Sequence, residues 1–182
     1  MRHRRLFWAA ILLQVLVLVG MIGSHGYTLW TGRPVMLKTA PVDPWDPLRG
    51  EYVTLSYEIS TLRHDQVAMN GAPYHQMQTV WVLLEQQGEF WSAVQVSDQR
   101  PAASPAQLAM RGTVAYYDGG VGRPGDVRVR YGIEQFYVPE GEARGLPGNG
   151  DRANMAVEVM VDSFGRAGLH RVYLEGQEIR WR

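Results

Sequence analysis

The sequence predicts a mainly β protein in which a single N-terminal transmembrane helix is followed by one compact antiparallel β-sandwich or small β-barrel. Three observations lead to this fold class. An apolar run of helix length occupies residues 6–22. Beyond it, apolar and polar residues alternate in short segments separated by glycine and proline. The 20 glycines and 10 prolines, with many β-branched and aromatic residues, favour sheet over helix.

The apolar run is the first expected element. Between Leu6 and Ile22, only Gln14 and Gly20 are not apolar. As a helix the run measures about 25 Å, slightly short of a hydrocarbon core of roughly 30 Å, and its extension makes up the difference. We therefore expect a transmembrane anchor with an interfacial end over residues 6–30. Aromatic rings prefer the membrane interfaces, and those expected there are Trp8 on the inner side and Tyr27 and Trp30 on the outer side.

The distribution of charge predicts the orientation of this anchor. Arginines crowd residues 1–5, which the positive-inside rule keeps in the cytoplasm, so residues 31–182 are expected to form one extracytoplasmic β-rich domain. A cleaved signal peptide is the alternative. Against it, the apolar run is longer than the usual roughly 7 to 15 residues, and no Ala-x-Ala-like site follows Val19. Both alternatives place the domain outside the cytoplasm.

The stretch from Pro41 to Ile59 is the segment around which the domain is organised. Two Asp-Pro pairs stiffen its first part, because each proline keeps the preceding residue out of helical geometry. One continuous strand is then expected over residues 51–59, where the residues alternate between a buried face and a wet face. The buried face would hold Val53, Leu55, Tyr57 and Ile59, and the wet face Tyr52, Thr54, Ser56 and Glu58.

Seven further strands are expected along the chain, mostly in consecutive hairpins. Their ranges are 35–40, 79–85, 89–96, 110–117, 127–131, 156–162 and 169–175. The strand at 79–85 is apolar on both faces, so we place it centrally. The alternation fails between Thr61 and Met77, which indicates a loop or a short irregular helix. A long exposed loop is expected over residues 140–154.

Two segments carry a resemblance to a known family. The first is Gly50-Glu51-Tyr52-Val53-Thr54-Leu55-Ser56-Tyr57, and the second is Phe136-Tyr137-Val138-Pro139-Glu140-Gly141-Glu142. The first closely resembles the signature of the GDYXXLXY family of bacterial membrane-anchored proteins, and the second resembles that family's Val-Pro-Glu-Gly segment. Glu51 replaces the family's Asp, and Ala143-Arg144 stands where a glycine is expected.

The resemblance implies a protein of the bacterial inner membrane, and it brings no biochemical activity with it. It also implies a partner, because proteins similar to this one are often encoded beside multi-pass membrane proteins. The candidate motif and partner-binding residues are Asp43, Trp45, Asp46, Arg49, Gly50, Glu51, Tyr52, Leu55, Tyr57, Pro139, Glu140 and Gly141.

These candidates have different expected roles. Trp45 lies on a stiff turn and suits a partner anchor or a ring that dips into lipid headgroups. Tyr57 is expected in the core with its hydroxyl on a partner, whereas Tyr52 would contact a ligand or cover a neighbouring strand. Arg49 and Glu140 are the pair expected to join the two segments in one electrostatic patch.

No metal site or cofactor is predicted. Four carboxylates between Asp43 and Glu58 are of the type that calcium prefers. Their spacing lacks the Asp-x-Asp-x-Asp-Gly pattern, and turn formation with pairing to Arg49 explains them better. The five histidines show neither His-x-His nor His-x-x-x-His spacing, and the chain has no cysteine.

No catalytic residue is predicted either. The sequence contains neither Gly-x-Ser-x-Gly nor a glycine-rich phosphate loop. Lys38 is its only lysine, and no serine stands where a Ser-Lys peptidase needs its nucleophile. Beyond the first five residues the chain is mildly acidic, which argues against a nucleic acid partner.

We therefore expect a non-catalytic binding or scaffold module that is anchored in the membrane and serves an envelope or membrane protein partner. A multi-pass membrane protein is the foremost candidate partner. One alternative is an envelope hydrolase using carboxylates near Asp43, Asp46 and Glu140, two of which would have to lie about 5 to 10 Å apart. Another is a small-ligand-binding β-barrel, which needs an empty apolar cavity.

Overall fold

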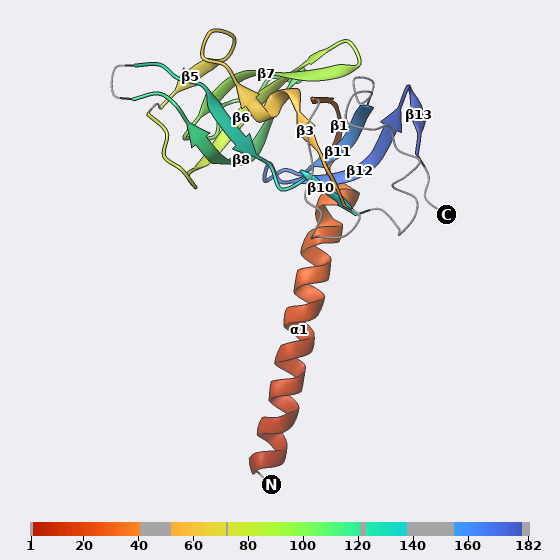
Figure 1. The fold of residues 1–182 in the computed structure, drawn as a ribbon. Helices are drawn as coiled ribbons and strands as arrows, with labels where there is room; N and C mark the ends of the chain where they lie inside the picture. The colour runs from red at the N-terminus through yellow and green to blue at the C-terminus, as the bar shows by residue number, and fades with distance from the viewer. Residues whose placement is uncertain (1, 41–51, 72, 121–122, 138–154, 180–182) are drawn as a thin grey trace.

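The fold is one long helix below a β-rich domain (Figure 1). The computed structural model describes residues 2–40, 52–71, 73–120, 123–137 and 155–179. Helix α1 (Arg2–Thr31) occupies the N-terminus, and most of the remaining described chain lies in strands. The expected mainly β fold with a single N-terminal helix is therefore confirmed.

Helix α1 is long and apolar enough to cross a membrane over Leu6–Thr31. Its apolar side chains, including Leu6, Leu13 and Val19, are exposed. A helix that is apolar all round without a protein partner is typical of a membrane span. The N–H of Gly32 donates to the carbonyl of Thr28 at 3.0 Å and completes the last turn, and the chain then enters the sheet directly.

The first sheet has the order β13-β12-β11-β1-β3 and is antiparallel throughout. Its strands are β1 (Arg33–Ala40), β3 (Ser56–Tyr57), β11 (Met155–Val161), β12 (Ala167–Leu174) and β13 (Gln177–Glu178). The predicted alternation near the C-terminus is confirmed, because Val157, Val159 and Val161 are all buried. Strand β13 was not predicted; it is only two residues long, too short to show a period.

The second sheet has the order β4-β9-β8-β6-β7-β5. Its strands are β4 (Thr61–Leu62), β5 (Ala68–Asn70), β6 (Thr79–Gln87), β7 (Phe90–Ser97), β8 (Gln107–Tyr117) and β9 (Val127–Arg130). Strand β6 lies between β8 and β7, which confirms its central placement. Gly88, with a φ of 67°, makes the turn of the predicted β6–β7 hairpin.

Two expectations from the sequence are wrong. The region from Thr61 to Met77 is not simply a loop, because it contributes the edge strands β4 and β5, which are too short for their periodicity to be visible. The continuous strand over residues 51–59 is interrupted. It divides into β2 (Tyr52–Thr54), β3 and the short 3-10 helix η1 (Glu58–Ser60).

At Leu55 the chain changes its pairing partner. The N–H of Leu55 donates to the carbonyl of Glu134 at 2.7 Å. This bond is the last on the β10 side: β2 pairs with β10 (Gln135–Tyr137), whereas β3, which follows Leu55, pairs with β1. The predicted buried face nevertheless survives, because Leu55, Tyr57 and Ile59 are all buried.

One hydrophobic core lies between the two main sheets. Strand β1 packs against β7 of the second sheet and so joins the two layers. Both sheets are curled, and among the described strands neither closes on itself. The core includes Val35, Leu37, Leu84, Met110 and Val129, each fully buried.

Candidate functional site

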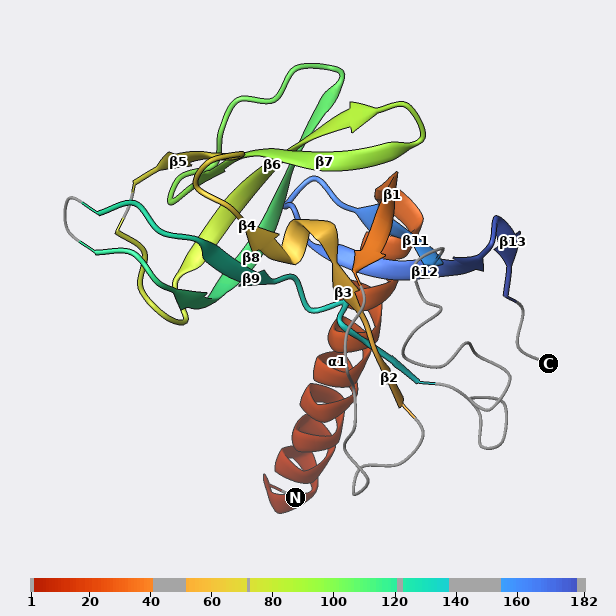
Figure 2. The same ribbon diagram turned by 45° about the horizontal axis from the view of Figure 1, so that its top comes forward.

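The two segments singled out in the sequence lie side by side. Strand β2 lies within the signature segment, and β10 includes the first two residues of the Val-Pro-Glu-Gly segment. The two strands pair antiparallel, with Tyr52 opposite Tyr137. About eighty residues separate the two strands in the sequence. The β2–β10 pair stands apart from both main sheets and extends toward the side from which α1 leaves the domain (Figure 2).

Two buried tyrosines hold the chain just beyond this pair. The Tyr57 hydroxyl donates to the carbonyl of Ile133 at 2.6 Å, and the Tyr131 hydroxyl donates to the carbonyl of Ile59 at 2.7 Å. Each tyrosine thus bonds the backbone of the other's segment. We call this reciprocal pair the tyrosine crossing. Because both hydroxyls and both acceptors are buried, the crossing fixes the position of the signature segment relative to residues 131–134.

The Glu134 carboxylate organises the turn that carries Tyr131. Its oxygens accept the backbone N–H groups of Tyr131 and Gly132. Burial raises the pKa of the Tyr57 and Tyr131 hydroxyls well above the ordinary value, and the nearby Glu134 charge raises both further. The two hydroxyls therefore stay protonated at neutral pH and act as hydrogen-bond donors. Sequence reasoning missed Tyr131 and Glu134; a signal was the glycine between them, which marks a turn next to a carboxylate.

A second buried polar contact attaches α1 to the domain. The Thr28 hydroxyl donates to Oδ2 of Asp162 at 2.7 Å, and Oδ1 of Asp162 accepts the backbone N–H groups of Phe164 and Arg166, both at 2.9 Å. We call Thr28, Asp162 and the turn over residues 162–166 the helix junction. A hydrogen bond from a neutral donor to a buried carboxylate is stronger than one between neutral groups.

The same turn also reaches the second sheet. The Gly165 carbonyl accepts the N–H of Arg111 in β8 at 2.7 Å. Gly165 has a φ of 76°, and a Cβ added there would lie 2.4 Å from the ring of Trp81 in β6, so only glycine fits. The helix junction therefore connects α1 with both sheets and fixes the helix relative to the domain.

Two of the open hollows in the described surface are large and have charged walls. One, of about 740 Å³, is bordered by β1, β12 and the β6–β7 hairpin, and its charged lining groups are Lys38, Glu58, Glu89 and Glu175. The Lys38 ammonium also lies 4.8 Å from the centre of the Phe90 ring. The other, of about 420 Å³, has Arg111, Arg130, Arg166 and Glu134 on its walls. Both hollows carry charged walls, unlike the empty apolar cavity that a small-ligand-binding barrel needs.

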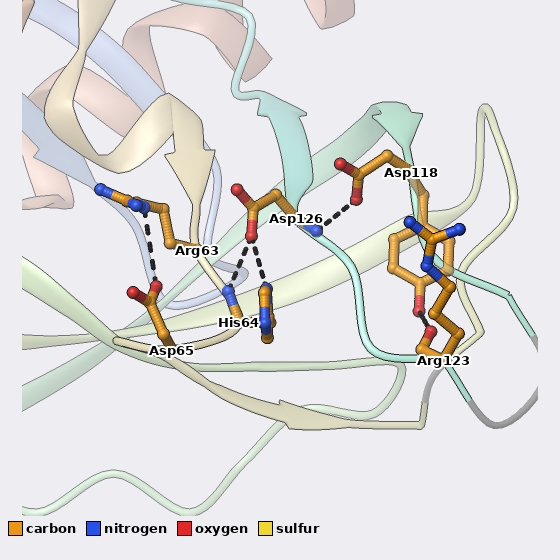
Figure 3. A network of polar contacts seen from close by, with 7 residues as sticks. Arg63, His64, Asp65, Asp118, Arg123 and Asp126 are labelled. Atoms are coloured by element: carbon orange, nitrogen blue, oxygen red, sulfur yellow. Dashed lines mark hydrogen bonds and ion pairs between the residues drawn. The ribbon is translucent and has the colours of Figure 1, made fainter.

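A polar network joins β4 to the connection between β8 and β9 (Figure 3). Oδ1 of Asp126 accepts the backbone N–H of His64 at 3.0 Å and contacts its Nδ1 at 2.9 Å, while the N–H of Asp126 donates to Asp118. The His64 backbone N–H, and after it the His64 ring, hold the pKa of the Asp126 carboxyl below its usual value. The network is exposed and ties two connections together. Among the described residues, no three His, Asp or Glu side chains are placed to hold a metal ion.

A family comparison accounts for the paired segments. The family model described as GDYXXLXY protein matches residues 14–172, which is most of the chain. The chain belongs to the GDYXXLXY family. No curated protein and no solved structure matches it.

Two signature residues of this GDYXXLXY protein, Leu55 and Tyr57, belong to the hydrophobic core. Leu55 and Tyr57 are buried with 3% and 1% of their surface exposed, so neither can contact a partner in the folded domain. Tyr52 lies in β2, paired with β10, and belongs to a different sheet from Tyr57. The remaining candidates lie outside the described residues; they are Asp43, Trp45, Asp46, Arg49, Gly50, Glu51, Pro139, Glu140 and Gly141.

Proposed function

We propose that this GDYXXLXY protein is a non-catalytic binding module of the bacterial inner membrane that presents its β-domain outside the cytoplasm to a membrane protein partner. The observation that carries the proposal is the helix junction. Because Asp162 joins the end of α1 to a turn held by both sheets, the domain and its β2–β10 pair have a fixed position relative to the helix. A domain held in this way can bind a neighbouring membrane protein at a defined distance from the membrane surface.

The composition of α1 supports the anchoring. From Leu6 to Tyr27 the helix spans about 30 Å, which is the thickness of a hydrocarbon core. The arginines at residues 2, 4 and 5 precede this span and favour a cytoplasmic N-terminus. This orientation carries the domain to the extracytoplasmic side as a single-pass protein.

The β2–β10 pair supports partner binding. The described signature side chains at Leu55 and Tyr57 are used to hold this pair in place. Within the residues that the structure describes, β2 and β10 pair only with each other, so each strand presents an edge. A strand of a partner can add to such an edge through main-chain hydrogen bonds. A multi-pass membrane protein beside α1 is the partner that we propose.

Photo-crosslinking at the β2–β10 pair tests this proposal. We would place benzoylphenylalanine at Gln135, which is exposed on β10, and at Gln87 as a control, which is exposed at the far end of β6. After irradiation of whole cells, Gln135 should give a discrete adduct with a membrane protein, and Gln87 should not. The proposal would be contradicted if the same adduct formed in equal yield from both positions, or if no adduct formed from position 135.

A further inference from the structure

The smaller hollow contains a concentration of arginine side chains. Arg111 of β8, Arg130 of β9 and Arg166 of the helix junction line it together. We propose that this arginine hollow binds the phosphate of an anionic phospholipid headgroup in the leaflet that faces the domain. The proposal deepens the proposed function and rests on α1 being embedded in a bilayer.

The arginine hollow lies next to the end of α1. The Arg166 guanidinium is 5.5 Å from the centre of the Phe164 ring, and that ring is 6.3 Å from the ring of Tyr27 in α1. Ala167, which also lines the hollow, precedes Gly168, where an added Cβ would lie 2.9 Å from Leu29. The hollow is therefore linked to the end of the helix through Phe164, whose ring lies between Arg166 and Tyr27.

This position corresponds to the headgroup layer. If the hydrocarbon core begins near Leu6, it ends near Tyr27, about 30 Å farther along the helix axis. The polar layer adds about 5 to 7 Å on each side, and Leu29 lies about 3 Å beyond Tyr27. Exposed aromatic rings at the same level suit an interface, since Trp30 is 89% exposed and Phe164 is 54% exposed.

The charges in the hollow favour a phosphate. Within the described part of the chain, none of its three arginines is in an ion pair, whereas Arg63 and Arg171 pair with carboxylates elsewhere. The polar contact that the Arg130 guanidinium makes among the described residues is with the Met77 sulfur, at 3.9 Å. Glu134 is the acidic group of the hollow, and its oxygens are already bonded to two backbone N–H groups.

Guanidinium groups bind phosphate oxygens through paired N–H donors, and they do so best where water is partly excluded. A free phosphate would satisfy the same donors. The apolar aromatic rim beside the hollow, however, fits a phosphate that is attached to acyl chains. A lipid phosphate bound in the hollow would give the domain a second attachment to the bilayer, beside α1.

The first test uses the wild-type full-length protein. We would reconstitute it in nanodiscs of phosphatidylcholine alone or with phosphatidylglycerol, react arginines with phenylglyoxal and quantify each site by mass spectrometry. Phosphatidylglycerol should protect Arg111, Arg130 and Arg166 more than phosphatidylcholine does, because the choline cation of phosphatidylcholine offsets the charge of its phosphate and repels the guanidinium groups. Arg128, an exposed arginine on the same strand as Arg130 but outside the hollow, should react equally in both discs.

A control with a soluble phosphate compound distinguishes a lipid phosphate from a free phosphate. In phosphatidylcholine discs, added glycerol phosphate should give little protection. Protection by glycerol phosphate equal to that by phosphatidylglycerol would overturn the lipid assignment, and equal labelling in both discs would overturn the site. In parallel, carbonate extraction of membranes tests whether α1 is embedded in the bilayer. A chain released by carbonate contradicts the proposed function and the inference together, whereas a retained chain with equal labelling contradicts the inference alone.

Variants provide the second test. The triple change Arg111→Gln, Arg130→Gln and Arg166→Gln should weaken phosphatidylglycerol binding by at least about tenfold in native mass spectrometry of the full chain, because charge-assisted hydrogen bonds are lost. Arg128→Gln is the matched control and should bind as the wild type does. If the triple variant fails to fold, single changes at Arg130 and Arg166 replace it. Wild-type affinity in folded variants would overturn the proposal.

Discussion

The tyrosine crossing and the helix junction both use buried hydroxyl donors, yet they connect different parts of the molecule. In the crossing, Tyr57 and Tyr131 join two segments that belong to the β-domain. In the junction, Thr28 joins the domain to the end of α1, which also contacts the domain through Tyr27. We infer that the crossing contributes to the stability of the domain, whereas the junction determines how the domain is mounted on α1.

The largest expected effect comes from removing the core side chain beside the crossing. Leu55→Ala deletes a side chain that is almost fully buried, so it should lower the free energy of unfolding by about 2 to 5 kcal/mol. Urea unfolding of the full chain in mild detergent, followed by tryptophan fluorescence, measures this loss. Ser56→Ala is the control at the adjacent, half-buried position and should change stability by less than about 0.5 kcal/mol.

Removing either hydroxyl of the crossing should have a smaller effect. Tyr57→Phe or Tyr131→Phe leaves a buried carbonyl without its donor, which costs about 1 to 3 kcal/mol. The same urea experiment measures it. Tyr116→Phe, on the exposed side of β8, is the matched control and should be neutral. If the three variants were equally stable, the crossing would have no role in holding the signature segment.

The crossing should also respond to alkaline pH. Its two hydroxyls have raised pKa values in the folded domain, whereas in the unfolded chain tyrosine ionises near pH 10. Unfolding above about pH 10 therefore releases protons, so stability is full below that pH and falls by about 1.4 kcal/mol per pH unit for each tyrosine. Tyr57→Phe removes one of the two titrating hydroxyls. It should therefore make the decrease of unfolding free energy above pH 10 less steep by about 1.4 kcal/mol per pH unit. A wild-type stability that is flat from pH 9 to pH 11 would contradict this account.

The smallest effect on domain stability is expected at the helix junction. Thr28→Val should lower the unfolding free energy of the domain by at most about 1 kcal/mol, because Asp162 loses one donor and keeps the backbone N–H groups of Phe164 and Arg166. Its effect should appear in the orientation of α1. Because the chain has no cysteine, spin labels can be attached only to cysteines introduced in place of Leu16 in α1 and Gln87 in β6. The experiment then measures the distance between these two positions. The distance distribution should be narrow in the wild type and broad in Thr28→Val.

The two regions were not equally predictable from the sequence. The side that each strand turns to the core could be read locally, because the alternation at Val157, Val159 and Val161 depends only on neighbouring residues. Tyr57 was placed in the core for the same reason. Its acceptor could not be found, since the Ile133 carbonyl is 76 positions away and periodicity specifies faces without specifying partners.

The junction was still harder to predict. Thr28 was assigned to the interfacial end of the anchor, and its buried bond to Asp162 spans 134 positions. A polar side chain that is buried by a distant segment leaves no periodic trace in its own neighbourhood. The hydrolase alternative depends on Asp43, Asp46 and Glu140, which lie outside the described residues, so that alternative and the Arg49–Glu140 patch stay predictions.

The proposed function depends above all on which side of the membrane each end of α1 lies. Single cysteines in place of Arg4 and Gln135 test this in spheroplasts treated with a membrane-impermeant maleimide. We predict that the cysteine at position 135 is labelled in intact spheroplasts, and that the cysteine at position 4 is labelled only after the membrane is permeabilised. Labelling of position 135 only after permeabilisation would place the β-domain in the cytoplasm and contradict the account.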